Sequence, residues 1–286
     1  MTKDVEKIIV WGLVVAALMS LMIVVAVLFP KVAEPQPRPT ETAPQTVGTK
    51  PIFSQPTEPK PTLVPNPYTA EDLLFQDGFM ELLEGPSITG IDVSYYQKDI
   101  DWIQVRDAGI EFVIVRLGYR GYESGNLFVD QKAYQNLYGA KEVGLRVGAY
   151  FYSQAITPQE AEEEAAFALQ ILDGFPLDMP VVFDWEFVTD NVARTDNMDA
   201  VTLTQCTIAF CEAIRAGGYH AMVYFNPYMA ENFVDLLAFQ DMGYPFWLAH
   251  YTDTMTFPHR VQIWQYSYTG KVPGIPGSVD LNIMLP

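Results

Sequence analysis

The sequence predicts an α/β fold for residues 88–286, an irregular (β/α) TIM-like barrel of five βα units plus three strands. From residue 88 onward, short apolar runs typical of buried strands alternate with longer runs of helical periodicity. The last three apolar runs leave no room for helices between them. Eight strands with βα units favour a closed barrel. A doubly wound open sheet is the alternative, but no glycine-rich phosphate fingerprint follows the first strand.

The expected elements follow one another in a regular order. Strands are expected at residues 91–95, 112–117, 146–152, 180–187, 220–226, 245–250, 260–266 and 278–284. Helices are expected at residues 101–108, 128–143, 158–172, 202–216 and 228–237. Ahead of the barrel, residues 68–87 are expected to form a short helical lead-in, because leucine and phenylalanine side chains in residues 69–83 form an apolar stripe.

The N-terminal part of the chain predicts a membrane anchor and a stalk. Residues 8–29 carry no charge and are long enough to span a hydrocarbon core of about 30 Å, so residues 1–30 are expected to form a cytoplasmic tail and one transmembrane helix in the lipid bilayer. A cleaved signal peptide is the alternative, but residues 29–33 form a poor cleavage site. Residues 31–67 are rich in proline and lack hydrophobic periodicity, which predicts a disordered stalk.

Charge and cysteine content exclude several classes of function. The net charge is −18, and the 219 residues after residue 67 carry 11 basic and 30 acidic side chains. Nucleic acid is therefore not an expected partner, because neutralising phosphates requires clustered Lys and Arg. Cys206 and Cys211 lie five residues apart in an expected helix, too far apart to form a disulfide, and are expected to be buried thiols. The three histidines lack the spacing of metal ligands, so neither a metal nor another cofactor is expected.

Four carboxylates are expected to meet at one end of the barrel. Asp184 and Glu186 end an apolar strand and, at positions i and i+2, point to the same face. Asp92 lies in the first strand and Asp280 in the last, and these two strands are neighbours in a closed barrel. Crowded, buried carboxylates raise one another's pKa, so one of them stays protonated near neutral pH. Such a group can act as the general acid that glycosidic bond cleavage requires.

Eight short motifs resemble glycoside hydrolase family 25 and occur in that family's order. They lie at residues 90–94 (GIDVS), 97–102, 112–116, 147–150, 180–186 (PVVFDWE), 247–251, 263–266 and 279–282. Members of this family are lysozyme-type muramidases, which cut the β-1,4 bond between N-acetylmuramic acid and N-acetylglucosamine in peptidoglycan. The resemblance covers residues 88–286 and implies an irregular barrel of five strand–helix units plus three strands, as the pattern of elements also predicts.

The resemblance also implies roles for individual residues. Glu186 matches the catalytic acid, Asp184 its partner that stabilises the transition state or orients the 2-acetamido group, and Asp92 and Asp280 match two further cleft acids. Participation of the acetamido group with retention and attack by an activated water both remain open. Five residues near strand ends are expected to line a sugar groove: Tyr150, Tyr152, Tyr224, Trp247 and Gln265. The chain departs from the family at residues 95–96 (YY) and 149–152 (AYFY), where His-Trp and Ala-Tyr-His-Phe are common.

Together these features predict a muramidase anchored in the bacterial membrane, with its catalytic domain on the cell-wall side and glycan strands of peptidoglycan as partner. The catalytic domain is expected to be monomeric. A wall-binding or sensory module with the same groove but little turnover is the alternative. A chitinase-like enzyme is less favoured, because residues 182–183 (VF) occupy part of the space where that family carries a longer series of acids.

Overall fold

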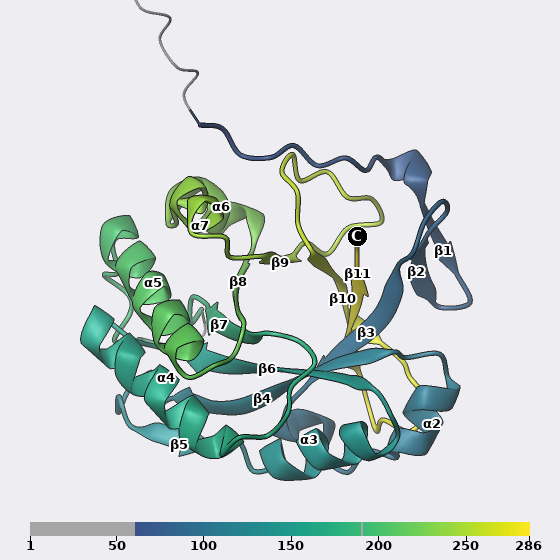
Figure 1. Ribbon diagram of the computed structural model, residues 1–286, viewed down its shortest axis with the longest axis horizontal. Coiled ribbons are helices and arrows are strands. Elements are labelled where there is room, and N and C mark those ends of the chain that lie inside the picture. Colours follow the sequence, from purple (N-terminus) through teal and green to yellow (C-terminus); the bar gives the residue numbers. More distant parts are fainter. Residues whose placement is uncertain (1–60, 190) are drawn as a thin grey trace, which may run out of the picture. The chain divides into compact units, whose positions relative to one another are not determined.

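Eight strands close into a barrel in the computed structural model of the protein, which describes residues 61–189 and 191–286 (Figure 1). Their order around the barrel is β3 (Ile88–Val93), β11 (Val279–Met284), β10 (Ile263–Gly270), β9 (Phe246–Ala249), β8 (Ala221–Phe225), β7 (Val181–Trp185), β6 (Arg146–Ser153) and β4 (Phe112–Arg120). Pairing of β4 with β3 closes the ring, which excludes an open sheet. The short strand β5 (Leu127–Val129) pairs with the end of β4.

In chain order, helices follow each of the first five barrel strands, as expected: β3, β4, β6, β7 and β8. The helices are α2 (Trp102–Asp107), α3 (Ala133–Glu142), α4 (Pro158–Leu172), α5 (Ala200–Ala216), α6 (Pro227–Asn232) and α7 (Leu236–Asp241). Figure 1 shows α4 and α5 packed side by side outside the strands. The start of the helix expected at 128–143 is instead β5 and a turn, and the one expected at 228–237 is divided into α6 and α7. Both cysteines are buried, free thiols in α5.

The direction of β11 distinguishes this barrel from a regular TIM barrel. Seven strands run parallel to one another, namely β3, β4, β6, β7, β8, β9 and β10. Strand β11 is antiparallel to both of its neighbours, β10 and β3. An antiparallel strand needs no helical crossover to enter the sheet, so β11 follows β10 directly through a loop. The fold is therefore a mixed α/β barrel.

The strands are buried on both faces, and alternate residues belong to two apolar clusters. Val113 and Val115 of β4 pack in the large cluster that includes residues of the outer helices, whereas Phe112 and Ile114 pack with residues from other strands inside the barrel. The interior cluster also contains Val182 of β7. Continuous apolar runs in these strands follow from this double burial. Residues two positions further along each strand point to the same face and lie nearer the mouth of the barrel.

The lead-in helix predicted for residues 68–87 is wrong. Residues 70–72 form a single 3-10 turn, and the chain then forms the antiparallel hairpin of β1 (Leu73–Gln76) and β2 (Phe79–Leu82). The turn residues Asp77 and Gly78 have φ angles of 53° and 93°. Asp-Gly readily takes such a conformation in two-residue hairpins, and this local signal outweighs the helical spacing of the apolar side chains.

Residues 61–67, which the sequence assigned to the stalk, lie against the barrel. Pro65 forms a β-bridge with His259, the amide of Asn66 donates to the carbonyl of Pro258 at 2.9 Å, and the amide of Arg260 donates to the carbonyl of Val64 at 2.9 Å. The expected anchor at residues 8–29, within the segment 1–30, and the expected stalk over 31–60 lie outside the described residues. Within 61–189 and 191–286, no helix has the length and apolar character needed to cross a membrane.

These contacts predict that a chain beginning at residue 68 is less stable than one beginning at residue 61. Losing several partly exposed hydrogen bonds and the β-bridge is expected to lower the free energy of unfolding by about 2 kcal/mol, and the Tm by about 5 °C. Thermal unfolding of the two purified chains at one pH measures the difference. Equal Tm values would show that residues 61–67 add no stability.

Candidate active site

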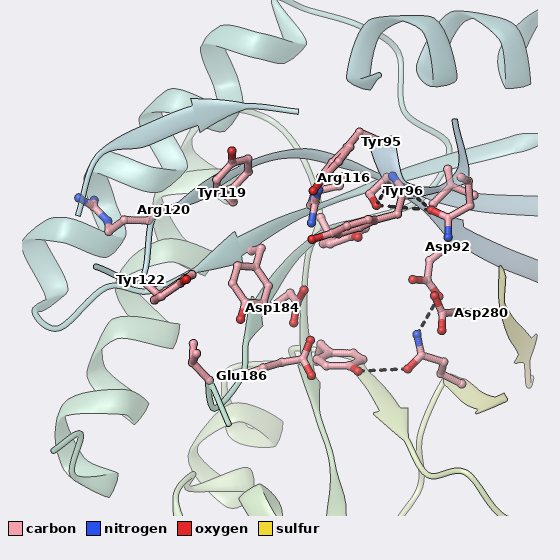
Figure 2. A pocket seen from close by; sticks show the side chains of 18 of the residues that line it. Asp92, Tyr95, Tyr96, Arg116, Tyr119, Arg120, Tyr122, Asp184, Glu186 and Asp280 are labelled. Carbon is pink, nitrogen blue, oxygen red and sulfur yellow. Dashed lines mark hydrogen bonds between the residues drawn. The ribbon is translucent and has the colours of Figure 1, made fainter. Parts of the chain in front are cut away.

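A cleft of about 670 Å³ opens at the carboxyl ends of the parallel strands and is seen from close by in Figure 2. It is lined by all nine residues that the sequence singled out: Asp92, Tyr150, Tyr152, Asp184, Glu186, Tyr224, Trp247, Gln265 and Asp280. The structure thus brings the nine together, and their chemical roles remain predictions. Further lining residues to which the sequence assigned no role include Tyr95, Tyr96, Arg116, Tyr119 and Tyr251.

Strand pairing places the four acids around the cleft. Asp184 lies near the end of β7, and Glu186 follows that strand by one residue, so both continue the inward-facing series that begins with Val182. Asp280 of β11 is the direct pairing partner of Asp92 of β3. Because β11 runs antiparallel, its first residues lie at the end of the barrel where the other strands finish. In Figure 2 the side chains of Asp184 and Glu186 face the cleft from one side and Asp92 and Asp280 from another.

Two side-chain amides hold Asp92. Gln265 Nε2 and Asn282 Nδ2 each donate to Asp92 Oδ2 at 2.8 Å. Trp247 Nε1 in turn donates to Asn282 Oδ1 at 2.8 Å, and the hydroxyl of Tyr251 donates to Gln265 Oε1 at 2.8 Å. Gln265 and Trp247, expected as groove residues, therefore also orient an acid.

Asn282 and Tyr251 were missed as site residues, although the sequence contains a signal for each. Asn282 lies two positions after Asp280 in the same strand and therefore shares its face. Tyr251 ends the motif at residues 247–251. Partners of a buried carboxylate can thus be sought at alternate positions of neighbouring strands.

Burial raises the pKa of all four carboxyl groups. It raises the pKa of Asp92 to about 6, although the two amides oppose this by stabilising its charge. Burial, followed by the charge of Asp92, raises the pKa of Glu186 to about 7 and that of Asp280 to about 8. For Asp184, burial and the charges of Glu186 and Asp92 raise the pKa well above its usual range. These pKa values favour protonated carboxyl groups in the site at neutral pH, with burial as the larger cause and the charges of neighbouring acids as the smaller one.

Asp184 and Glu186 lie close enough to affect each other's ionisation. Burial is the main cause of both raised pKa values, and the interaction between the two carboxyl groups adds to that of Asp184 and opposes that of Glu186. Asp184 Oδ1 is buried and has no hydrogen-bond partner within the described residues. Since both pKa values lie above the usual range for a carboxyl group, the pair retains a proton that can be transferred to a leaving group. The arrangement is suited to general acid catalysis at a polar bond.

Comparisons with known proteins agree with this geometry. The sequence pattern of the family described as Glycosyl hydrolases family 25 matches residues 91–275, well over half of the chain. The chain belongs to glycosyl hydrolases family 25. It is 30% identical over 213 residues to the uncharacterized protein YegX of Escherichia coli O157:H7, with 69% of each chain covered. It is 27% identical over 196 residues to the autolytic lysozyme of Clostridium acetobutylicum, covering 68% of this chain and 54% of that protein.

Solved structures share the fold of this chain. The modular autolysin LytC of Streptococcus pneumoniae, in complex with a synthetic peptidoglycan ligand, superposes with a TM-score of 0.62 at 24% identity, covering 74% of this chain and 52% of that one. The chain thus spans about half the length of LytC. A family 25 glycosyl hydrolase of Bacillus anthracis superposes with a TM-score of 0.57 at 20% identity, covering 70% of this chain and 89% of that one.

In this family 25 enzyme a buried amide holds the main chain of Glu186. Gln154 follows β6 by one residue, and its Nε2 donates to the carbonyl of Glu186 at 3.1 Å. Thr195 Oγ1 donates to Gln154 Oε1 at 2.8 Å. The pairing of β6 with β7 ends at Ser153 and Trp185, so the Gln154 side chain extends the contact between these strands by one residue. Nothing in the sequence indicated this role, because the contact depends on where both strands end.

The raised pKa values predict a pH-dependent gain of stability in the Asp184→Asn variant. A carboxyl whose pKa is raised on folding binds its proton more tightly in the folded state, so its contribution to stability is present at low pH and is lost as pH rises. The variant is expected to exceed the parent in free energy of unfolding by on the order of 1 kcal/mol at pH 8, and by little at pH 4. Denaturant titrations at both pH values measure this difference.

The matched control is Asp253→Asn, which removes the charge of an exposed carboxyl outside the cleft. It is expected to change stability little at either pH. A loss of stability in Asp184→Asn at pH 8, or the same change at both pH values, would contradict the proposed cost of ionising Asp184.

Proposed function

We propose that the protein is a lysozyme-type muramidase that hydrolyses the β-1,4 bond between N-acetylmuramic acid and N-acetylglucosamine in peptidoglycan. The observation that carries this proposal is the proton-retaining pair of Asp184 and Glu186 in a cleft lined by aromatic side chains. Membership of glycosyl hydrolases family 25 and similarity to two proteins named lysozymes, the second from Streptomyces globisporus, support it.

Glu186 acts as the proton donor in the proposed reaction. It protonates the glycosidic oxygen as the bond breaks and positive charge develops on the sugar ring. Asp184 stabilises that charge in its ionised form, or orients the 2-acetamido group of the sugar in its protonated form. Participation of the acetamido group, with retention, and direct attack by an activated water both begin with this proton transfer.

After burial, the charge of Asp92 is what raises the pKa of the proton donor Glu186. The amides of Gln265 and Asn282 stabilise the ionised form of Asp92, and the charge of Asp92 in turn raises the pKa of Glu186. The charge of Asp92 also raises the pKa of Asp280, its pairing partner on the neighbouring strand. Asp92 therefore helps Glu186 keep its proton until the substrate accepts it.

The alternative function, a wall-binding module without turnover, uses the same cleft. A binding groove gains nothing from several carboxyl groups whose burial disfavours ionisation, because sugar recognition needs hydrogen bonds and stacking. The raised pKa values of four acids therefore favour catalysis over binding alone.

The Glu186→Gln variant tests the reaction directly. It keeps the shape of the side chain but lacks a proton to donate, so release of new reducing ends from purified peptidoglycan is expected to fall about 10²-fold or more, while binding to the wall is retained. The control Glu84→Gln changes an exposed carboxyl outside the cleft and should retain the parent's rate. A parent protein that binds the wall but releases no muramic acid reducing ends would support the binding-module alternative.

We further propose that residues 8–29 anchor the enzyme in the membrane, with the N-terminus in the cytoplasm and the barrel on the cell-wall side. This proposal rests on the uncharged 22-residue segment alone. The proline-rich residues that follow would hold the barrel up to roughly 100 Å from the bilayer if largely extended. Tethering would keep the acidic domain near the wall without electrostatic attraction to anionic wall polymers.

Membrane fractionation of cells expressing the full chain checks the anchor. The full chain is expected to sediment with membranes and to resist extraction by high salt, whereas a chain of residues 61–286 should remain in the soluble fraction. Protease added to wall-stripped cells should digest the barrel if it faces outward. Release of the full chain by salt, or a mature protein whose N-terminus lies beyond residue 29, would contradict the anchor.

A further inference from the structure

Arg116 is a buried cation at the cleft whose guanidinium is only partly paired. It lies on β4, two residues after the inward-facing Ile114, and 8% of its surface is exposed. Its Nε donates to Asp130 Oδ2 at 2.8 Å. The opposite nitrogen, Nη2, is buried and has no hydrogen-bond partner within the described residues. A buried donor without a partner costs free energy, so such an atom indicates a site that a ligand completes.

Asp130 accepts a hydrogen bond from Nε of Arg116 and not from its terminal nitrogens. Its Oδ1 accepts from the amide of Lys132 at 2.8 Å, and its Oδ2 accepts from the amide of Tyr95 at 3.1 Å as well as from Arg116. The Asp130 side chain is fully buried and is held by these three donors. It therefore fixes the direction of Arg116 and leaves the two terminal nitrogens for other partners.

Three tyrosine rings surround the guanidinium. Its central carbon lies 5.2 Å from the ring centre of Tyr95 and 5.4 Å from those of Tyr96 and Tyr119. These contacts favour the charged form, and neighbouring groups raise the pKa of Arg116 in spite of its burial. In Figure 2 the guanidinium points toward the cleft floor, where Asp184 lies. Of the three rings, Tyr96 is 65% exposed.

The second cationic side chain at the cleft has no such capacity. Arg120 donates from Nε to Glu164 at 2.7 Å, from Nη1 to the carbonyl of Gly125 at 2.8 Å, and from Nη2 to the carbonyl of Glu160 at 2.8 Å. The other charged lining residues in the described chain are acids: Asp92, Glu123, Asp184, Glu186 and Asp280. Among the lining residues of the described segments, Arg116 thus offers the cationic donors that remain unpaired.

We infer that Arg116 forms a subsite for a carboxylate carried by the muramoyl side chain of the glycan, and that this contact makes the cleft select muramoyl units over N-acetylglucosamine. The inference rests on the proposed function. Muramic acid differs from glucosamine by a lactyl ether that ends in a carboxyl group, and a guanidinium pairs with carboxylates through parallel hydrogen bonds. The carboxylate is that of the lactyl group where no peptide is attached, or that of an attached peptide.

The competing explanation is that Arg116 acts only on the acids of the cleft. Its charge lowers the pKa of Asp184 against the effect of burial. Removing that charge would alter the binding or turnover of every glycan alike. Selectivity between glycans with and without a carboxylate therefore separates the two explanations.

Binding is measured by calorimetry on the full-length Glu186→Gln protein, which does not consume the ligand, with and without Arg116→Gln. The ligands are tetrasaccharides of alternating N-acetylglucosamine and N-acetylmuramic acid, the same glycan with its lactyl carboxyls converted to methylamides, the peptide-bearing glycan, and chitotetraose. Arg116→Gln is expected to weaken binding of a carboxylate-bearing glycan by about tenfold or more, as for a lost hydrogen bond to a charged group. Binding of the methylamide and of chitotetraose should not change.

The two carboxylate sources give different results. Selective loss for the peptide-free glycan assigns the lactyl carboxylate, and selective loss for the peptide-bearing glycan assigns the peptide carboxylate. Equal loss for all four ligands, or no loss for any, overturns the inference. If the parent protein releases no reducing ends, the proposed function fails instead, which the Glu186→Gln comparison on peptidoglycan shows independently.

Two further variants show whether a change in affinity reflects misfolding instead of the lost contact. Arg116→Lys keeps the charge beside Asp130 but not the planar pair of donors, and it is expected to retain the fold with a smaller selective loss. Arg106→Gln removes an exposed arginine outside the cleft that pairs with Asp107, and should leave all four affinities unchanged. If Arg116→Gln unfolds, Arg116→Lys decides, and an unchanged preference for carboxylate-bearing glycans in that variant overturns the inference.

Discussion

The register between β3 and β11 is the contact on which the site depends. It joins the first barrel strand of the chain to the last and sets Asp92 directly opposite Asp280, with Asn282 opposite Gly90. A shift of one residue would turn Asp280 and Asn282 to the outer face and place apolar side chains in the cleft. Gly90 faces the interior beside the ring of Phe112, where an added Cβ would lie 2.3 Å from that ring. Close packing at the base of the barrel thus helps to fix which residues reach its mouth.

The cleft combines groups that disfavour ionisation with groups that support it. Burial keeps protons on the carboxyls, while the amides of Gln265 and Asn282 stabilise one carboxylate among them. Because the donors belong to β10 and β11, the charge of Asp92 is set by the last two strands of the barrel. Gln154 and Thr195 act on the other side, where they hold the main chain of Glu186 beyond the end of β7. The fold thereby supports an arrangement of acids that is costly in isolation.

Much of the fold and part of the site follow from periodicity in the sequence. The spacing of Asp184 and Glu186 indicates a shared face, and the absence of helical segments near the C-terminus indicates three consecutive strands. The hairpin at residues 73–82 does not follow from periodicity, because its leucines have a helical spacing and only the Asp-Gly turn indicates two strands. The position of Arg116 two residues after Ile114 predicts an inward side chain, but its burial, its missing partner and its surrounding rings depend on contacts distant in sequence.

The packing of residues 61–67 determines how force would enter the molecule. If the chain is anchored at its N-terminus, as proposed, a pull from that side would reach the barrel first at the bridge between Pro65 and His259 and the hydrogen bond between Val64 and Arg260. Arg260 also donates to the carbonyl of Pro286, so the load would pass to the C-terminal end of the chain. None of these residues lines the cleft. A tethered enzyme could thus be strained at its attachment while the geometry around its acids is left undisturbed.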